Sequence, residues 1–83
     1  MQILVRGPKQ LGDGIRRFRQ LADLTQAELA EKSTLWQETI SKLERQAGGA
    51  RFSTICDVLL ALDLELILQP RTKGSEREME EIF

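Results

Sequence analysis

The chain has 83 residues, with 12 Lys and Arg against 13 Asp and Glu, a formal net charge of −1. This length allows one domain with a small core, so we expect a dimer partner to contribute to stability. One cysteine and no histidine exclude an internal disulfide, make a zinc site implausible and leave no convincing nucleophile–base pair. The composition therefore predicts a protein that is not an enzyme and that uses no metal or cofactor.

The charge is unevenly distributed along the chain. Residues 1–73 hold eleven Lys and Arg against nine Asp and Glu, a net of +2, whereas residues 74–83 hold one Arg and four Glu, a net of −3. The net charge of the whole chain is therefore negative because of its acidic C-terminal segment, while the rest of the chain is mildly basic. Binding to DNA would depend on where the cations lie and not on bulk charge. No segment resembles a signal peptide or a membrane span, so we expect a cytoplasmic chain.

The N-terminal part predicts a short strand and one helix. Residues 2–6 alternate and are β-prone, and Pro8 then suits the first turn of a helix. Gly12 and Gly14 weaken this helix by about 1 kcal/mol each relative to Ala, so they either allow close packing or are merely tolerated. The apolar residues of the helix recur at the spacing of one buried face: Leu11, Ile15, Phe18 and Ala22.

Residues 25–45 (TQAELAEKSTLWQETISKLER) predict two short helices joined by a tight connection, near 26–32 and near 37–45. Thr25 and Glu28 have the spacing of a capping box at the start of the first helix. The second helix turns its apolar residues inward. A row of polar side chains is left facing solvent: Gln37, Glu38, Thr39 and Lys42. Such a face suits an element that enters the DNA major groove.

The C-terminal part predicts a fourth helix and a second strand. We expect Ser53 to cap the helix, and Cys56 to be a small core residue of it, with a redox switch as the alternative. Residues 64–69 alternate again, and Pro70 ends them. This alternation puts three apolar residues on one face of the strand: Leu64, Leu66 and Leu68. Two isolated strands cannot satisfy their own edges, so we expect them to pair across a two-fold axis in a dimer.

Residues 25–45 resemble the helix-turn-helix of phage-repressor-like regulators, the Cro/C1 or XRE class. A strand followed by GPKQLGDGIRRFRQLADLTQAELAEKS, TISKLER and FSTICDVLLALDLELILQPR resembles the HipB-like antitoxins. The resemblance implies a mainly α fold over residues 1–70, with four to five helices of Cro/C1 type and short N- and C-terminal strands that form an intersubunit sheet. It also implies a homodimer that represses its own operon at an inverted-repeat operator and holds a HipA-like serine/threonine kinase toxin inactive.

The resemblance also implies roles for individual residues. The polar row matches the family positions that reach base edges, and an ordinary solvated helix face is the alternative. Gln26 resembles a residue that binds a phosphate while bracing the first recognition glutamine, and Lys9 and Arg51 are further candidates for the DNA backbone. Trp36 either contacts a sugar or phosphate or packs under the turn as an anchor.

Arg19 and Glu44 match a family pair in which the first helix is tied to the end of the recognition helix by a partly buried ion pair. Two unrelated surface charges are the alternative. The chain departs from the family at Thr34, where Gly is usual, so we expect a different turn geometry. It also has Trp36 where Ser or Thr would cap the recognition helix, and Gln46 where Gly often follows that helix.

From Arg71 the chain is polar and charged, which predicts a disordered acidic tail over residues 71–83. HipB-like antitoxins carry a flexible extension whose terminal aromatic residue engages the toxin. The resemblance therefore implies that Ile82 and Phe83 anchor the tail on the kinase, with a solvated tail as the alternative. Two other functions fit the sequence: a free-standing repressor without a toxin, and a protein-binding adaptor with a degenerate DNA face.

Overall fold

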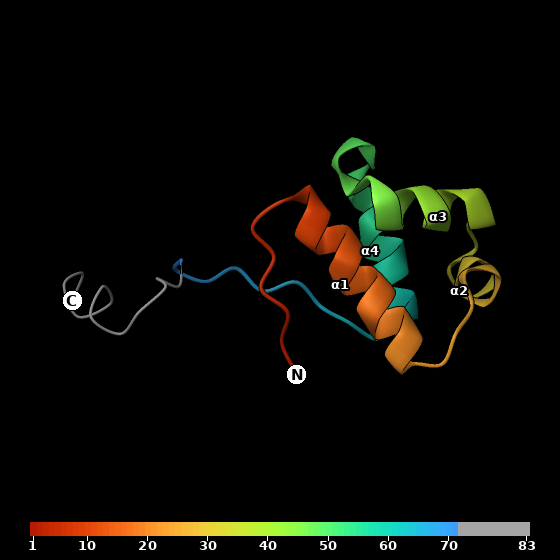
Figure 1. Ribbon diagram of the computed structural model, residues 1–83, viewed down its shortest axis with the longest axis horizontal. Coiled ribbons are helices and arrows are strands. Elements are labelled where there is room, and N and C mark those ends of the chain that lie inside the picture. The colour runs from red at the N-terminus through yellow and green to blue at the C-terminus, as the bar shows by residue number, and fades with distance from the viewer. Residues whose placement is uncertain (72–83) are drawn as a thin grey trace.

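The computed structural model describes residues 1–71, so the predicted disorder of the acidic tail and the predicted roles of Ile82 and Phe83 lie outside the described residues. The elements are α1 (Pro8–Leu21), α2 (Gln26–Ser33), α3 (Gln37–Arg45), the 3-10 helix η1 (Ala47–Gly49) and α4 (Phe52–Ala61). The helices gather at one end of the molecule, and the chain after α4 leads away from them (Figure 1). The mainly helical part of the predicted fold is confirmed.

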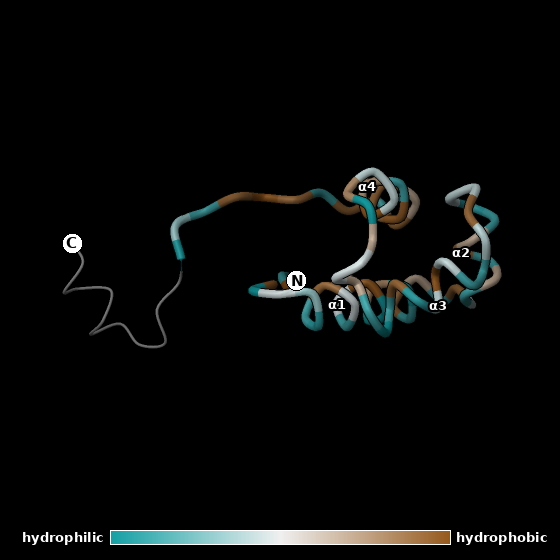
Figure 2. The backbone as a smooth tube through the Cα atoms, turned by 90° about the horizontal axis from the view of Figure 1, so that it is seen from above, coloured by the Kyte–Doolittle hydropathy of each residue, from teal (hydrophilic) through white to brown (hydrophobic). Residues whose placement is uncertain are grey.

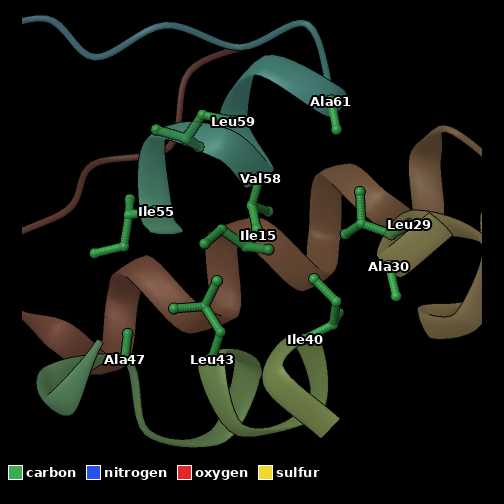
Figure 3. Packing of buried hydrophobic residues seen from close by; sticks show 10 residues of the cluster. All are labelled: Ile15, Leu29, Ala30, Ile40, Leu43, Ala47, Ile55, Val58, Leu59 and Ala61. Atoms are coloured by element: carbon green, nitrogen blue, oxygen red, sulfur yellow. The ribbon is translucent and has the colours of Figure 1, made fainter. Parts of the chain in front are cut away.

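The core lies between the four helices, as Figure 3 shows for ten buried side chains. Helix α2 packs against α3 and α4, and α1 packs against α3 and η1. Burial of each large apolar side chain stabilises the fold by about 1.5–3 kcal/mol. Every α-helix contributes at least one side chain that is almost fully buried: Ile15, Leu29, Ile40, Leu43 and Val58.

Three sequence predictions within the helices are wrong. Ala22 is exposed because α1 ends at Leu21, which leaves Ala22 as the C-cap outside the buried face. Ser53 is not a cap but the second residue of α4, which begins at Phe52 with Arg51 as its N-cap and no side-chain capping bond. Cys56 is exposed. It follows the buried Ile55 directly and is therefore turned about 100° away from the inward side of α4.

Helices α1, α2 and α4 end in the same way. Each is followed by a residue with a positive φ near 60° and then by a leucine whose amide bonds back to the helix, as in a Schellman motif. The amides of Leu24, Leu35 and Leu64 donate to backbone carbonyls at 3.1, 2.8 and 2.8 Å. The expectation of a different geometry at Thr34 is wrong, because its φ of 61° and ψ of 38° are the left-handed values that Gly would adopt.

The two segments predicted to be strands are extended, but residues 1–71 contain no strand. They cross in Figure 1, yet Figure 2 shows them apart, so they do not lie side by side within one chain. Leu64 packs against the core, whereas Leu66 is 50% exposed and Leu68 is fully exposed. The C-terminal segment leads away from the helices, and its apolar middle part lies between hydrophilic residues at both ends (Figure 2). An intersubunit sheet stays a prediction.

Candidate nucleic-acid interface

Helix α3 presents a polar face because its apolar residues are committed to the core. Ile40 and Leu43 are almost completely buried, whereas Gln37, Glu38 and Lys42 are exposed and Thr39 is half-buried. Both ends of α3 fall where the sequence predicted them. The helix ends at Arg45, and its C-cap Gln46 has a φ of −145°, a negative value that non-glycine residues adopt, so no glycine is needed there.

Two hollows lie beside this face. The first is at the start of α3 and also involves the first residue of α2. Its lining consists of Gln26, Trp36, Gln37, Glu38 and Ser41. The Trp36 side chain is 81% exposed, which excludes the alternative that it packs under the turn. As the sequence predicted, Trp36 makes no side-chain capping bond.

The second hollow lies between α3, the loop that contains η1, and the start of α4. It brings two cations, Lys42 from α3 and Arg51 from the N-cap position of α4, to the same side of the molecule, together with Thr39. Thr54 and Gln46 also line it, and neither was among the predicted site residues. The same is true of Ser41 in the first hollow. The sequence could have indicated Ser41, because it lies four residues after Gln37 and such a spacing places both residues on one side of a helix.

Lys9 lies apart from both hollows. Its Nζ contacts Asp13 Oδ2 at 3.1 Å, and both side chains are highly exposed. The start of α1 is close to η1, because a Cβ added to Gly48 would lie 3.3 Å from Pro8 Cγ. The structure therefore brings together Thr39, Lys42 and Arg51 in one group, and Gln26, Trp36, Gln37 and Glu38 in the other. Lys9 belongs to neither group.

The predicted ion pair between α1 and α3 is present. Arg19 Nε lies 2.6 Å from Glu44 Oε2, and a second guanidinium nitrogen donates to Glu44 Oε1 at 3.1 Å. The third nitrogen donates to the Leu24 carbonyl at 2.8 Å. The side chains of Arg19 and Glu44 are only 11% and 3% exposed. The hydrogen bonds and charge of Glu44 raise the pKa of Arg19 despite its burial.

Gln26 belongs to this cluster as well. Its Nε2 donates to Glu44 Oε1 at 3.1 Å, so one carboxylate joins residues from α1, α2 and α3. In the described part of the chain the hydrogen bond of the Gln26 side chain therefore goes to Glu44 and not to Gln37. The sequence did not predict this link. It requires knowing that the side chains of Gln26 on α2 and Glu44 on α3 meet when these two helices pack.

Comparison with known proteins agrees with this architecture. A family model for helix-turn-helix domains, HTH_3, matches residues 15–68. Antitoxin HipB of Escherichia coli (strain K12) is 31% identical over 74 residues, which cover 89% of this chain and 84% of HipB. A solved chain from a HipA-HipB-O2-O3 complex superposes with a TM-score of 0.79 at 30% identity, covering 87% of this chain and 100% of that one.

A second relative comes from Sinorhizobium fredii (strain NBRC 101917 / NGR234), where it is called an uncharacterized HTH-type transcriptional regulator, y4dL. It is 37% identical over 57 residues, which cover 69% of this chain but 29% of that protein. The chain thus spans less than a third of the length of y4dL. Among the helices of residues 1–71, none combines the length and the apolar character that a membrane-spanning segment needs.

Proposed function

Because the chain belongs to the helix-turn-helix family HTH_3, we propose that it is a sequence-specific DNA-binding repressor. The observation that carries this proposal is the face of α3, where polar side chains are exposed on a helix whose other side is anchored in the core and by a buried ion pair. A rigid helix with exposed polar side chains can lie in the major groove and read base edges. We also propose that the protein works in the cytoplasm.

The residue types on α3 suit direct readout. The Gln37 amide can pair with adenine, Lys42 can donate to guanine, and the Thr39 methyl group can contact thymine. Glu38 can accept from the amino group of cytosine. We assign contacts with the DNA backbone to three residues that flank the face, Gln26, Trp36 and Arg51. Lys9, at the start of α1 and apart from both hollows, is assigned a fourth such contact.

Alanine substitution tests these assignments. We expect Lys42→Ala to weaken binding to a duplex selected from a random library by about 1–3 kcal/mol and to relax the preference for that duplex. Arg51→Ala is the matched control on the same hollow, and it should weaken binding to selected and shuffled duplexes alike. If Lys42→Ala reduced the affinity for both duplexes equally, Lys42 would be a backbone contact and not a base-reading residue.

We propose that two copies bind one operator as a dimer. The support is the apolar segment after α4, whose leucines at 66 and 68 are exposed in the single chain. The backbone N–H and C=O groups of this segment could pair with those of a second copy. Two α3 helices about 34 Å apart would then read an inverted repeat. Sedimentation should detect a dimer at micromolar concentration. Leu68→Glu should weaken the dimer and DNA binding together, and a monomer both alone and on DNA would contradict the proposal.

We also propose that the chain is the antitoxin of a HipA-like serine/threonine kinase and represses its own operon. The likeness to HipB over most of the length of both proteins supports this proposal, as does the likeness to a chain solved together with HipA. In this role Ile82 and Phe83 would anchor the tail on the kinase. Truncation after Lys73 should leave DNA binding unchanged and weaken neutralisation of a kinase encoded beside the gene, whereas equal neutralisation would exclude a role for the tail.

A free-standing repressor is the second candidate, since the relative y4dL is called a transcriptional regulator. Both candidates predict sequence-specific binding to DNA, but only the antitoxin predicts binding to a kinase. The absence of a kinase-like gene beside this one, with retained binding to its own upstream DNA, would support the second candidate.

A further inference from the structure

Glu44 is the single buried charged residue among residues 1–71, and three donors share its carboxylate. Arg19 holds both oxygens, through Nε to Oε2 at 2.6 Å and through a second nitrogen to Oε1 at 3.1 Å. Gln26 Nε2 donates to the same Oε1 at 3.1 Å. Two bonds from one planar guanidinium fix the plane of the carboxylate. The third bond, from Gln26, then links the fixed carboxylate to the first residue of α2.

The Gln26 side chain faces two environments. It is half-buried, it bonds to Glu44, and it lines the hollow that also contains Gln37 and Trp36. A carboxylate can only accept hydrogen bonds, so the NH2 end of the amide must be the end that meets Glu44. One N–H is used in that bond. The second N–H and the carbonyl oxygen of Gln26 are left for a partner.

We infer that Glu44 is a positioning residue for DNA binding: held by Arg19, it orients the Gln26 amide so that the second N–H reaches a DNA phosphate at the start of α3. This inference rests on the proposed DNA-binding function and specifies how the buried cluster serves it. An amide that is already oriented in the free protein loses less side-chain freedom when DNA binds. The guanidinium of Arg19 also offsets the negative charge of Glu44, which would otherwise oppose a nearby phosphate.

For the DNA affinity of a Glu44→Gln variant, the inference and simple electrostatics predict opposite changes. Glu44→Gln keeps the size of the side chain but removes a negative charge near the DNA face, so charge alone predicts tighter binding. The carboxylate has two oxygens that together accept from the three donors. A glutamine has a single side-chain oxygen, which cannot accept from all three. Gln26 would lose its fixed orientation, and positioning therefore predicts weaker binding.

A double-mutant cycle on the full chain tests the inference. Fluorescence anisotropy would measure the Kd for a labelled duplex selected by the wild-type protein from a random library, at a temperature where every variant is folded. We expect Glu44→Gln to raise the Kd about fivefold in the wild-type background and less than twofold in the Gln26→Met background. The dependence of the Kd on salt should not change in Gln26→Met, because a neutral amide releases no counterion.

An equal loss in both backgrounds, or tighter binding by Glu44→Gln in the wild-type background, would overturn the inference while leaving the proposed function intact. If the wild-type chain bound selected and shuffled duplexes equally, the proposed function itself would fail, and the inference with it.

Nuclear magnetic resonance of the wild-type protein provides a test that does not require a stable variant. In the free protein, one Gln26 side-chain N–H should exchange with solvent more slowly than either N–H of the exposed Gln37 side chain. The second should slow only when the selected duplex is added. Fast exchange of both protons in the free protein, or no response of the second to the duplex, would overturn the inference.

Discussion

Gly12 lies directly against the backbone carbonyl of Glu44, where α1 meets the end of α3. A Cβ at position 12 would be 2.7 Å from the Glu44 oxygen and 2.9 Å from the Leu43 oxygen, closer than real carbon atoms approach. Both neighbours are backbone atoms of a packed helix, so a side chain at position 12 cannot displace them easily. Further along α1, Arg19 bonds to the side-chain carboxylate of the same residue, Glu44.

Substitution of this glycine should destabilise the protein even though alanine favours helices. We expect Gly12→Ala to lower the free energy of unfolding by about 2 kcal/mol, because overpacking outweighs a propensity gain of about 1 kcal/mol. Gly14→Ala is the matched control, since its Cβ would lie 3.4 Å from Ile3 Cγ2, at ordinary contact distance. Urea unfolding should show this control to be neutral or stabilised. Equal effects of the two substitutions would contradict the packing role of Gly12.

The buried and exposed ion pairs should differ strongly in their contribution to stability. Glu44→Ala should cost about 3 kcal/mol, because it leaves the largely buried Arg19 without its carboxylate. Asp13→Ala removes the exposed partner of Lys9 and should cost less than about 1 kcal/mol. Thermal melting followed by circular dichroism would compare them. A melting temperature unchanged by Glu44→Ala would refute the contribution of the buried pair.

The end of α2 should tolerate glycine better than the native residue. Thr34 is β-branched and has a φ of 61°, a conformation that costs a non-glycine residue of this shape about 1–2 kcal/mol. We therefore expect Thr34→Gly to stabilise the protein by about 1 kcal/mol in chemical denaturation. Asp63→Gly, at a φ of 57°, is the control and should gain less, because Asp adopts this region more readily. A loss of stability in Thr34→Gly would mean that the Thr34 side chain makes a contribution larger than the strain.

The capping box at the start of α2 should make part of the stability depend on pH. The backbone N–H of Thr25 donates to Glu28 Oε1 at 2.9 Å, and this bond lowers the pKa of Glu28 below its usual 4.5. A carboxylate whose pKa is lower in the folded state stabilises the fold above the unfolded pKa, and this contribution is lost as the pH falls through the folded pKa.

Glu28→Gln tests this dependence, because a glutamine keeps a side-chain acceptor and cannot titrate. Urea unfolding of wild type and variant should show the wild type to be more stable at pH 6, and the difference should shrink as the pH falls below about 4.5. A difference that is constant from pH 6 to pH 3 would show that the charge of Glu28 contributes nothing.

Much of the fold was predictable because it depends on local patterns. The capping box at Thr25, the proline at the start of α1 and the bounds of α3 follow from short-range rules, and each is present. The Arg19–Glu44 pair was identified through family resemblance, since its members are 25 residues apart. Spacing alone could not have paired them.

The remaining features depend on where helices begin and on which elements meet. The apolar character of Cys56 favours a core position, but the inward side of α4 carries Ile55, Val58 and Leu59. Cys56 directly follows Ile55 and therefore faces outward. The bond from Gln26 to Glu44 arises only once α2 and α3 are packed. The predicted sheet requires a second copy, so no single chain could contain it.

The central claim is that the face of α3 reads a DNA sequence. It is tested most directly by the ratio of two affinities of the wild-type chain, one for a duplex selected from a random library and one for a shuffled duplex, at 150 mM salt. Specific recognition predicts a ratio of at least about 10³ in favour of the selected duplex. A ratio near one, with both affinities falling equally as salt rises, would mean that the chain binds only the phosphate backbone and would contradict the claim.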